Sequence, residues 1–157
     1  MIKSIWLLIP VALLLACDPD RVFEENKNLE EAYWHKDSLV TFEFDVPAAD
    51  RKYDLYANIR NAQHFPFYNL YYQYTLSDSS GVVLAQELKN INLFDPKTGE
   101  PYGSGLGDLF DHRQLLLSAY DFPAQGKYTL TFEQYMRQDS LALIMSVGAR
   151  LEQVTGQ

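Results

Sequence analysis

The chain of 157 residues contains a single cysteine, Cys17. One cysteine excludes an intramolecular disulfide, so the fold must be held together by its core alone. If Cys17 is itself modified, no thiol remains for catalysis, and the sequence has no Gly-x-Ser-x-Gly nucleophile motif. We therefore expect a protein that is not an enzyme and that uses no cofactor.

Side chains that could hold a metal ion in a recognisable pattern are also scarce. The three histidines, His35, His64 and His112, lie far apart and form no H-x-x-x-H pair. An EF-hand loop needs oxygen ligands at alternate positions, but Lys97 and Gly99 occupy those places in the acidic segment near residue 100. We expect no metal site.

A phosphate-binding loop is suggested only by the glycine-rich stretch GSGLG at 103–107. Its third glycine comes one residue too early for the dinucleotide-binding pattern, and no helical pattern or Gly-Lys-Ser/Thr sequence follows it. Glycine adopts positive φ angles that other residues resist. We expect these glycines to serve backbone geometry, with at least one of them at positive φ.

Basic residues are outnumbered. The chain has 13 Lys and Arg against 21 Asp and Glu, for a net charge of −8. Residues 1–16 carry one charge, on Lys3, so their removal would leave 12 basic against 21 acidic residues. This balance argues against nucleic acid as a partner, because that affinity depends on neutralising phosphates. It also argues against docking to anionic lipid through a basic patch.

No apolar run is long enough to cross a membrane, which takes about 20 residues. The longest run, Ile5–Leu15, is interrupted by Pro10. A buried helix would normally keep a polar face, and this run has none. A secretory signal needs a basic start, a short apolar stretch and a small residue at the cleavage site, and Lys3, the run and Ala16 supply these in order. We interpret residues 1–16 as a signal peptide.

The position of the cysteine refines this interpretation. The sequence LLAC at 14–17 is similar to the bacterial lipobox, in which the chain is cut before the cysteine. Cys17 would then carry a diacylglycerol on its thiol and an acyl group such as palmitate on its amino group. The alternative is a free thiol in a cleaved or buried segment. We expect cleavage between Ala16 and Cys17, attachment of the lipid at Cys17, and a tether over residues 17–38.

Beyond this tether the apolar residues alternate with polar ones. VTFEFDV at 40–46 is typical, with its apolar side chains on one face. Seven or eight such segments, separated by turn residues and without a helical period, predict an all-β fold. We expect an antiparallel β-sandwich of the jelly-roll or immunoglobulin-like type over 39–152, followed by a tail at 153–157. Trp34 is expected to anchor the preceding segment in the core.

One loop combines aromatic and polar residues densely. Its members of interest are Arg60, Asn61, Phe65, Phe67 and Tyr68. In one interpretation the aromatic residues cap an end of the sandwich and Arg60 pairs with an acid. In the other, these five residues form a patch that binds a partner, as loops on rigid scaffolds often do.

Several motifs are spread in order over nearly the whole chain after residue 16. They are CDPDRVFEEN at 17–26, Trp34 with F-x-F at 42–44, IRNAQHFPFYNLYY at 59–72, GEPYGSGLGDLFD at 99–111, FPAQGKYTLTFEQYMR at 122–137 and VGARLE at 147–152. With these motifs the chain resembles the GldH family. Its members are envelope lipoproteins needed for gliding motility in bacteria that use type IX secretion.

The resemblance implies an accessory or structural role without catalysis, in which the protein is attached to the membrane through Cys17. Its partners would be proteins of the gliding or secretion apparatus. The implied location is the outer membrane, on either its periplasmic or its outer side. A second class of function stays open, namely a glycan-binding sandwich of the cell envelope. A row of exposed aromatic rings along a groove would favour glycans, and an apolar patch with a polar rim would favour a protein partner.

Overall fold

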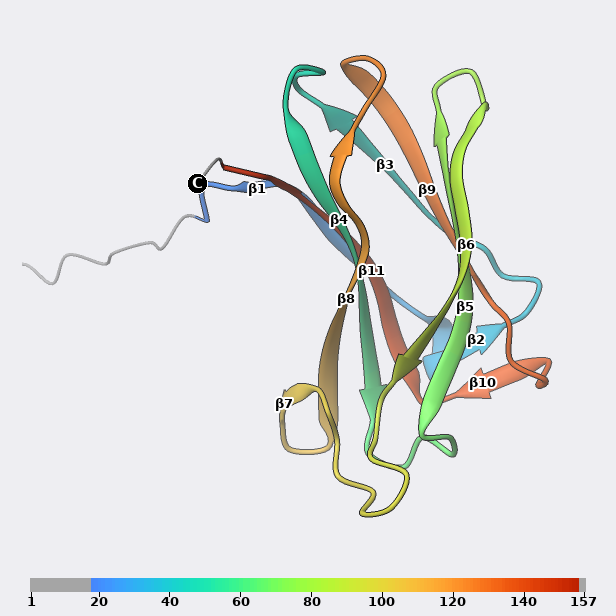
Figure 1. The fold of residues 1–157 in the computed structure, drawn as a ribbon. Coiled ribbons are helices and arrows are strands. Elements are labelled where there is room, and N and C mark those ends of the chain that lie inside the picture. Colours follow the sequence, from blue (N-terminus) through green and yellow to red (C-terminus); the bar gives the residue numbers. More distant parts are fainter. Residues whose placement is uncertain (1–17, 156–157) are drawn as a thin grey trace, which may run out of the picture.

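The computed structural model describes residues 18–155, which form β-strands and one short 3-10 helix (Figure 1). The strands are β1 (Arg21–Asn28), β2 (Tyr33–His35), β3 (Val40–Val46), β4 (Lys52–Ala62), β5 (Asn69–Asp78), β6 (Val83–Asn92), β7 (Ser104–Leu106), β8 (Leu109–Asp121), β9 (Gly126–Gln134), β10 (Ser140–Ala142) and β11 (Ile144–Gln153). The 3-10 helix η1 spans Glu30–Ala32. The predicted all-β class is confirmed, and every strand pairing is antiparallel.

The strands form two main layers. One is a five-stranded sheet in the order β1-β11-β4-β8-β7, and the other is a four-stranded sheet in the order β3-β9-β5-β6. The short strands β10 and β2 pair separately at one end of the sandwich. β1 lies near β3 along one side, whereas β8 and β6 lie along the other. Among the residues that the structure describes, no further strand covers the outer face of the five-stranded sheet.

The core lies between the layers and is rich in aromatic rings. Alternation along β3 buries Val40, Phe42, Phe44 and Val46, as the sequence pattern predicts. Phe122 packs edge-on against the rings of neighbours at 4.7–6.2 Å between centroids. Such edge-to-face contacts add to the stabilisation that burial provides.

Trp34 is completely buried, which confirms the predicted anchor. Its indole Nε1 donates a hydrogen bond to the carbonyl of Ser38 at 3.1 Å, so its polar atom is satisfied. The residue sits on β2, opposite Leu141 of β10, and this pairing ties the segment before β3 to the end of the chain.

The expected tether over 17–38 is corrected by β1. Arg21–Asn28 pairs with β11 along its whole length and forms the edge of the five-stranded sheet. Val22 and Phe23 pack against the core, and the Phe23 ring lies 5.6 Å from that of Phe44. The strand was missed because most of its side chains are exposed and polar, which hides the alternation. Only residues 17–20 remain to link the lipid site to the sheet.

The sandwich has two ends, which we name by their residues. The anchor end holds residues 18–20, the turns at 47–51, 79–82 and 122–125, and residues 154–155. The far end holds residues 29–39, 63–68, 93–103, 107–108 and 135–143. The strand register supports this division. Arg21, at the start of β1, pairs with Glu152 near the end of β11, and Asn28, at the end of β1, pairs with Ser146 near the start of β11. In Figure 1 the anchor end lies towards the top and left, and the far end lies at the bottom and right.

Candidate functional site

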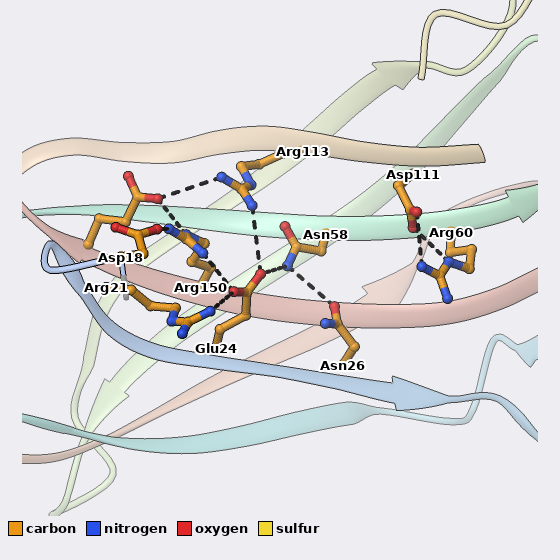
Figure 2. Close-up of polar contacts among 10 residues, drawn as sticks. Asp18, Arg21, Glu24, Asn26, Asn58, Arg60, Asp111, Arg113 and Arg150 are labelled. Atoms are coloured by element: carbon orange, nitrogen blue, oxygen red, sulfur yellow. Dashed lines mark hydrogen bonds and ion pairs between the residues drawn. The ribbon is translucent and has the colours of Figure 1, made fainter. Parts of the chain in front are cut away.

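The outer face of the five-stranded sheet carries a cluster of charges around Arg150 of β11 (Figure 2). The guanidinium is only 6% exposed and pairs with carboxylates of Asp18, Glu24 and Glu152, with 2.6 Å to Glu24. Burial alone would lower the pKa of Arg150, but hydrogen bonds to these three carboxylates outweigh it and raise that pKa. The hydrogen bond from Arg150 also lowers the pKa of Asp18. Arg150 is therefore a permanently charged centre that holds three acidic side chains.

This cluster fixes the position of the residue that follows the predicted lipid site. Asp18 is the next residue after Cys17, and its carboxylate is held on the sheet by Arg150. The first strand begins at Arg21. Four residue steps span at most about 14 Å of extended chain. A lipid on Cys17 would therefore keep the sandwich close to the membrane surface.

A groove of about 470 Å³ lies beside the Arg150 cluster on the same face. Its lining residues are Glu24, Asn26, Asn28, Asn58, Ile59, Arg60, Ser104, Asp111, His112, Arg113 and Ser146. They come from five strands, which the sheet brings together across its width. In Figure 2 the two amides of Asn26 and Asn58 lie between the Arg150 cluster and a second ion pair formed by Arg60 and Asp111.

The polar groups of the groove are partly paired with one another. Arg60 donates two hydrogen bonds to Asp111, at 2.7 and 2.9 Å, and this pairing raises the pKa of Arg60. Asn58 donates to Glu24 at 3.1 Å and to Asn26 at 3.3 Å. These contacts orient planar side chains across the face and leave further donor and acceptor atoms open towards the groove.

Gly148 of β11 gives the groove its shape. A Cβ at this position would collide with the Asn26 amide and lie 2.9 Å from the carbonyl of Glu25. A glycine inside a strand weakens it, and such a position often marks a close approach of another group. Here the missing side chain leaves room for Asn26 to lie over the strand.

The five residues predicted as a partner surface do not form one surface. Asn61 is fully buried and Phe65 is 5% exposed, so neither side chain can contact a partner, because the alternation of β4 and the packing of the loop turn them inward. Arg60 is exposed and pairs with Asp111, as the first interpretation of the loop stated. Phe67 is half-buried against Phe65, at 5.7 Å between ring centroids, and Tyr68 is 53% exposed.

A different set of exposed rings lies at the same end of the sandwich as Tyr68. The five tyrosines that are between 41% and 57% exposed all lie at the far end or at the adjacent start of β5, and we call them the far-end tyrosines. They are Tyr33, Tyr68, Tyr71, Tyr102 and Tyr135. The Tyr135 backbone N–H donates to the Tyr71 carbonyl at 2.8 Å, which places two of them on neighbouring segments. The exposure of one of them could have been predicted from the sequence. The alternation in β5 that buries Tyr72 and Tyr74 turns Tyr71 outward.

The glycine-rich stretch at 103–107 serves backbone geometry in two ways. Gly107 has a φ of +70° and begins the two-residue turn between β7 and β8, which confirms the prediction of a positive φ. Gly103 packs on the ring of His112, and a Cβ there would lie 2.7 Å from the ring atoms. Burial lowers the pKa of His112, and its Nε2 has no hydrogen-bond partner within residues 18–155.

Metal binding finds no support in the described part of the chain. Residues 18–155 contain no group of three or more His, Cys, Asp or Glu side chains placed to hold an ion. Ala16 and Cys17, the predicted cleavage and lipid sites, lie outside the described residues.

The family model described as GldH lipoprotein matches residues 21–151. The chain belongs to the GldH lipoprotein family. The matched residues begin at the first residue of β1 and end within β11, so the match covers nearly the whole sandwich.

Two curated relatives of this GldH-family chain are similar over most of its length. One is the gliding motility lipoprotein GldH of Flavobacterium johnsoniae, 34% identical over 154 residues, with 94% of each chain covered. The other is the gliding motility lipoprotein GldH homolog of Christiangramia forsetii, 33% identical over 149 residues, with 90% of each chain covered. Membership of this family makes the protein a lipid-anchored protein of the cell envelope.

A search of solved structures gave a weaker similarity. The infectious bursal disease virus VP2 subviral particle matches 99% of this chain and 38% of its own, at a TM-score of 0.40 and 11% identity. A similarity at that level carries no functional information. Within residues 18–155, no helix has the length and apolar character needed to cross a membrane.

Proposed function

We propose that this GldH-family lipoprotein acts in gliding motility as a non-catalytic accessory component of the gliding and type IX secretion machinery. It does so by binding a protein partner through the far end of its sandwich. The observation that carries the proposal is the gathering of the far-end tyrosines away from the residue that follows the lipid site. The names of the relatives, both gliding motility lipoproteins, support the pathway.

The anchor in this proposal is a lipid on Cys17 in the outer membrane. The lipobox sequence at 14–17 supports it, as does the family's description as lipoproteins. Because only residues 18–20 separate Cys17 from β1, the anchor end faces the membrane. The far end then points away from the lipid surface, where another protein can reach it.

The chemistry of the far end suits a protein partner. Tyrosine is enriched at protein interfaces, because its ring contributes apolar area while its hydroxyl forms hydrogen bonds. Leu106, at the tip of the β7–β8 hairpin, is 94% exposed and adds an apolar side chain to the same end. Within residues 18–155 the strongly exposed aromatic rings lie at or beside this one end, as expected of a docking surface.

The anchor is tested by mass spectrometry of the protein from membranes. The expected N-terminus is Cys17 carrying a diacylglycerol and an acyl chain, and Cys17→Ser should leave the precursor uncut and outside the membrane fraction. An unmodified Cys17 within an intact precursor would show that this part of the proposal is wrong.

The partner surface is tested by photocrosslinking in cells of the host. A photoreactive phenylalanine analogue replaces Tyr68 in one strain and Val82, an exposed residue of the anchor end, in a control strain. We expect a crosslinked protein from position 68 and none from position 82. The same product should disappear when Tyr71 and Tyr135 are changed to Ser. Equal crosslinking from both positions, or a product that is insensitive to these changes, would contradict the proposal.

A further inference from the structure

The groove on the outer face of the five-stranded sheet has features that the fold does not need. Gly148 lies inside β11, where glycine weakens a strand, and the absence of its side chain makes room for Asn26. Asn28 and Ser104 line the groove, are exposed, and make no side-chain hydrogen bond within residues 18–155. The groove therefore contains polar side chains that form no side-chain hydrogen bond within residues 18–155 and so do not stabilise the fold in that way.

The charges in the groove balance. The lining holds the carboxylates of Glu24 and Asp111 and the guanidinium groups of Arg60 and Arg113. A site for phosphate would need a surplus of positive charge, and a site for a divalent cation a surplus of carboxylates. The balance instead suits a ligand without net charge.

The lining also selects against an apolar ligand. Ile59 is its only aliphatic apolar residue, and that side chain is 1% exposed because it belongs to the core. Peptide partners are normally held by apolar or aromatic anchors in pockets, and this groove offers none. Among the described residues, the lining also has no row of aromatic rings, so a glycan would be held here by hydrogen bonds and not by stacking. The groove offers amide, hydroxyl, carboxylate and guanidinium groups, which donate and accept hydrogen bonds within a small area.

We propose that this groove binds a neutral saccharide, with the amides of Asn26, Asn28 and Asn58 and the Arg60–Asp111 pair forming hydrogen bonds to its hydroxyl groups. Hydroxyl groups both donate and accept, as the lining requires. The volume of about 470 Å³ lies within the range of small-ligand sites. The groove lies on the outer face of the five-stranded sheet and reaches Ser104, two residues from Tyr102, so it borders the far end. Its test therefore uses variants that leave the far-end tyrosines unchanged.

The test uses the full lipidated protein in nanodiscs of phospholipid, with no sugar-headed detergent. Saturation-transfer NMR and titration are carried out with two neutral trisaccharides, chitotriose and maltotriose, and with trigalacturonate as an acidic counterpart. We expect at least one neutral trisaccharide to bind, and to bind at least tenfold more tightly than trigalacturonate.

Asn28 provides variants that leave the observed contacts of the fold unchanged. Asn28→Ala removes a hydrogen-bonding group and should weaken binding about fivefold or more, while Asn28→Trp should fill the groove and abolish binding. Asn92, an exposed residue of β6 on the other sheet, provides the matched controls Asn92→Ala and Asn92→Trp, which should bind as the unchanged protein does. The proposal is overturned if neither neutral trisaccharide binds, if trigalacturonate binds as tightly, or if the Asn28 variants bind normally.

Discussion

Replacing Arg150 by leucine should both destabilise the sandwich and release its first residues. The substitution replaces only the first part of the arginine's aliphatic stem and removes the positive charge that holds Asp18, Glu24 and Glu152. Removing one partner of a buried ion pair costs about 3–5 kcal/mol. The carboxylates here are partly exposed, and water screens them once they are freed, so we expect a loss of about 2–3 kcal/mol.

The assay is urea unfolding of the wild-type protein and the variant, combined with hydrogen exchange over residues 18–28. We expect a lower midpoint and faster exchange in β1, because the edge strand loses the contact that fixes its beginning. Arg60→Leu is a matched control, since it removes an exposed ion pair with Asp111, and such pairs contribute at most about 1 kcal/mol. If Arg150→Leu changes stability by less than the control does and β1 exchanges as before, the cluster does not fasten the N-terminal segment.

Three further perturbations test the packing, the turn and the buried histidine. Trp34→Ala should lower the free energy of unfolding by about 3–5 kcal/mol in urea, whereas Tyr33→Ala, at an exposed neighbour, should change it little. Gly107→Val should cost about 1–2 kcal/mol through its positive φ, and Gly107→Asn clearly less; equal costs would point to steric contact instead. Because the pKa of His112 is lowered in the folded state, its contribution to stability is complete above about pH 6.5 and declines as the pH falls below that value. Urea midpoints at pH 7.5 and 5.5 should therefore differ more in the wild type than in His112→Gln, and an identical difference would refute this role.

The central strands could be predicted from the sequence because one of their faces is buried. In β3 and β9 every second residue is apolar, and the structure buries those residues. β1 could not be found in this way, because it is an edge strand in which Val22 and Phe23 pack against the core and the other six residues are polar. β1 is held by its pairing with β11, and its side-chain contact from Glu24 to Arg150 joins residues 126 positions apart.

The candidate sites were less accessible to sequence reasoning. The groove depends on the register of five strands, and the alternation of a single strand does not reveal which residues lie opposite one another. The sequence feature that points to this region is Gly148, because a glycine inside a strand pattern suggests a close approach of another group. In the aromatic loop the sequence did not distinguish Phe65, which turns into the core, from Tyr68, which faces outward. That difference arises from packing against segments distant in the chain.

The most direct test of the central claim measures motility with an altered far end. The chromosomal gene of the host receives Tyr68→Ser, Tyr71→Ser and Tyr135→Ser together, and a control strain receives Val82→Ser, Val83→Ser and Leu88→Ser, which alter exposed apolar residues away from the far end. Membrane fractions are checked for equal amounts of anchored protein. Colony spreading should be lost in the first strain and kept in the second. Normal spreading of the first strain, with the protein present and anchored, would contradict it.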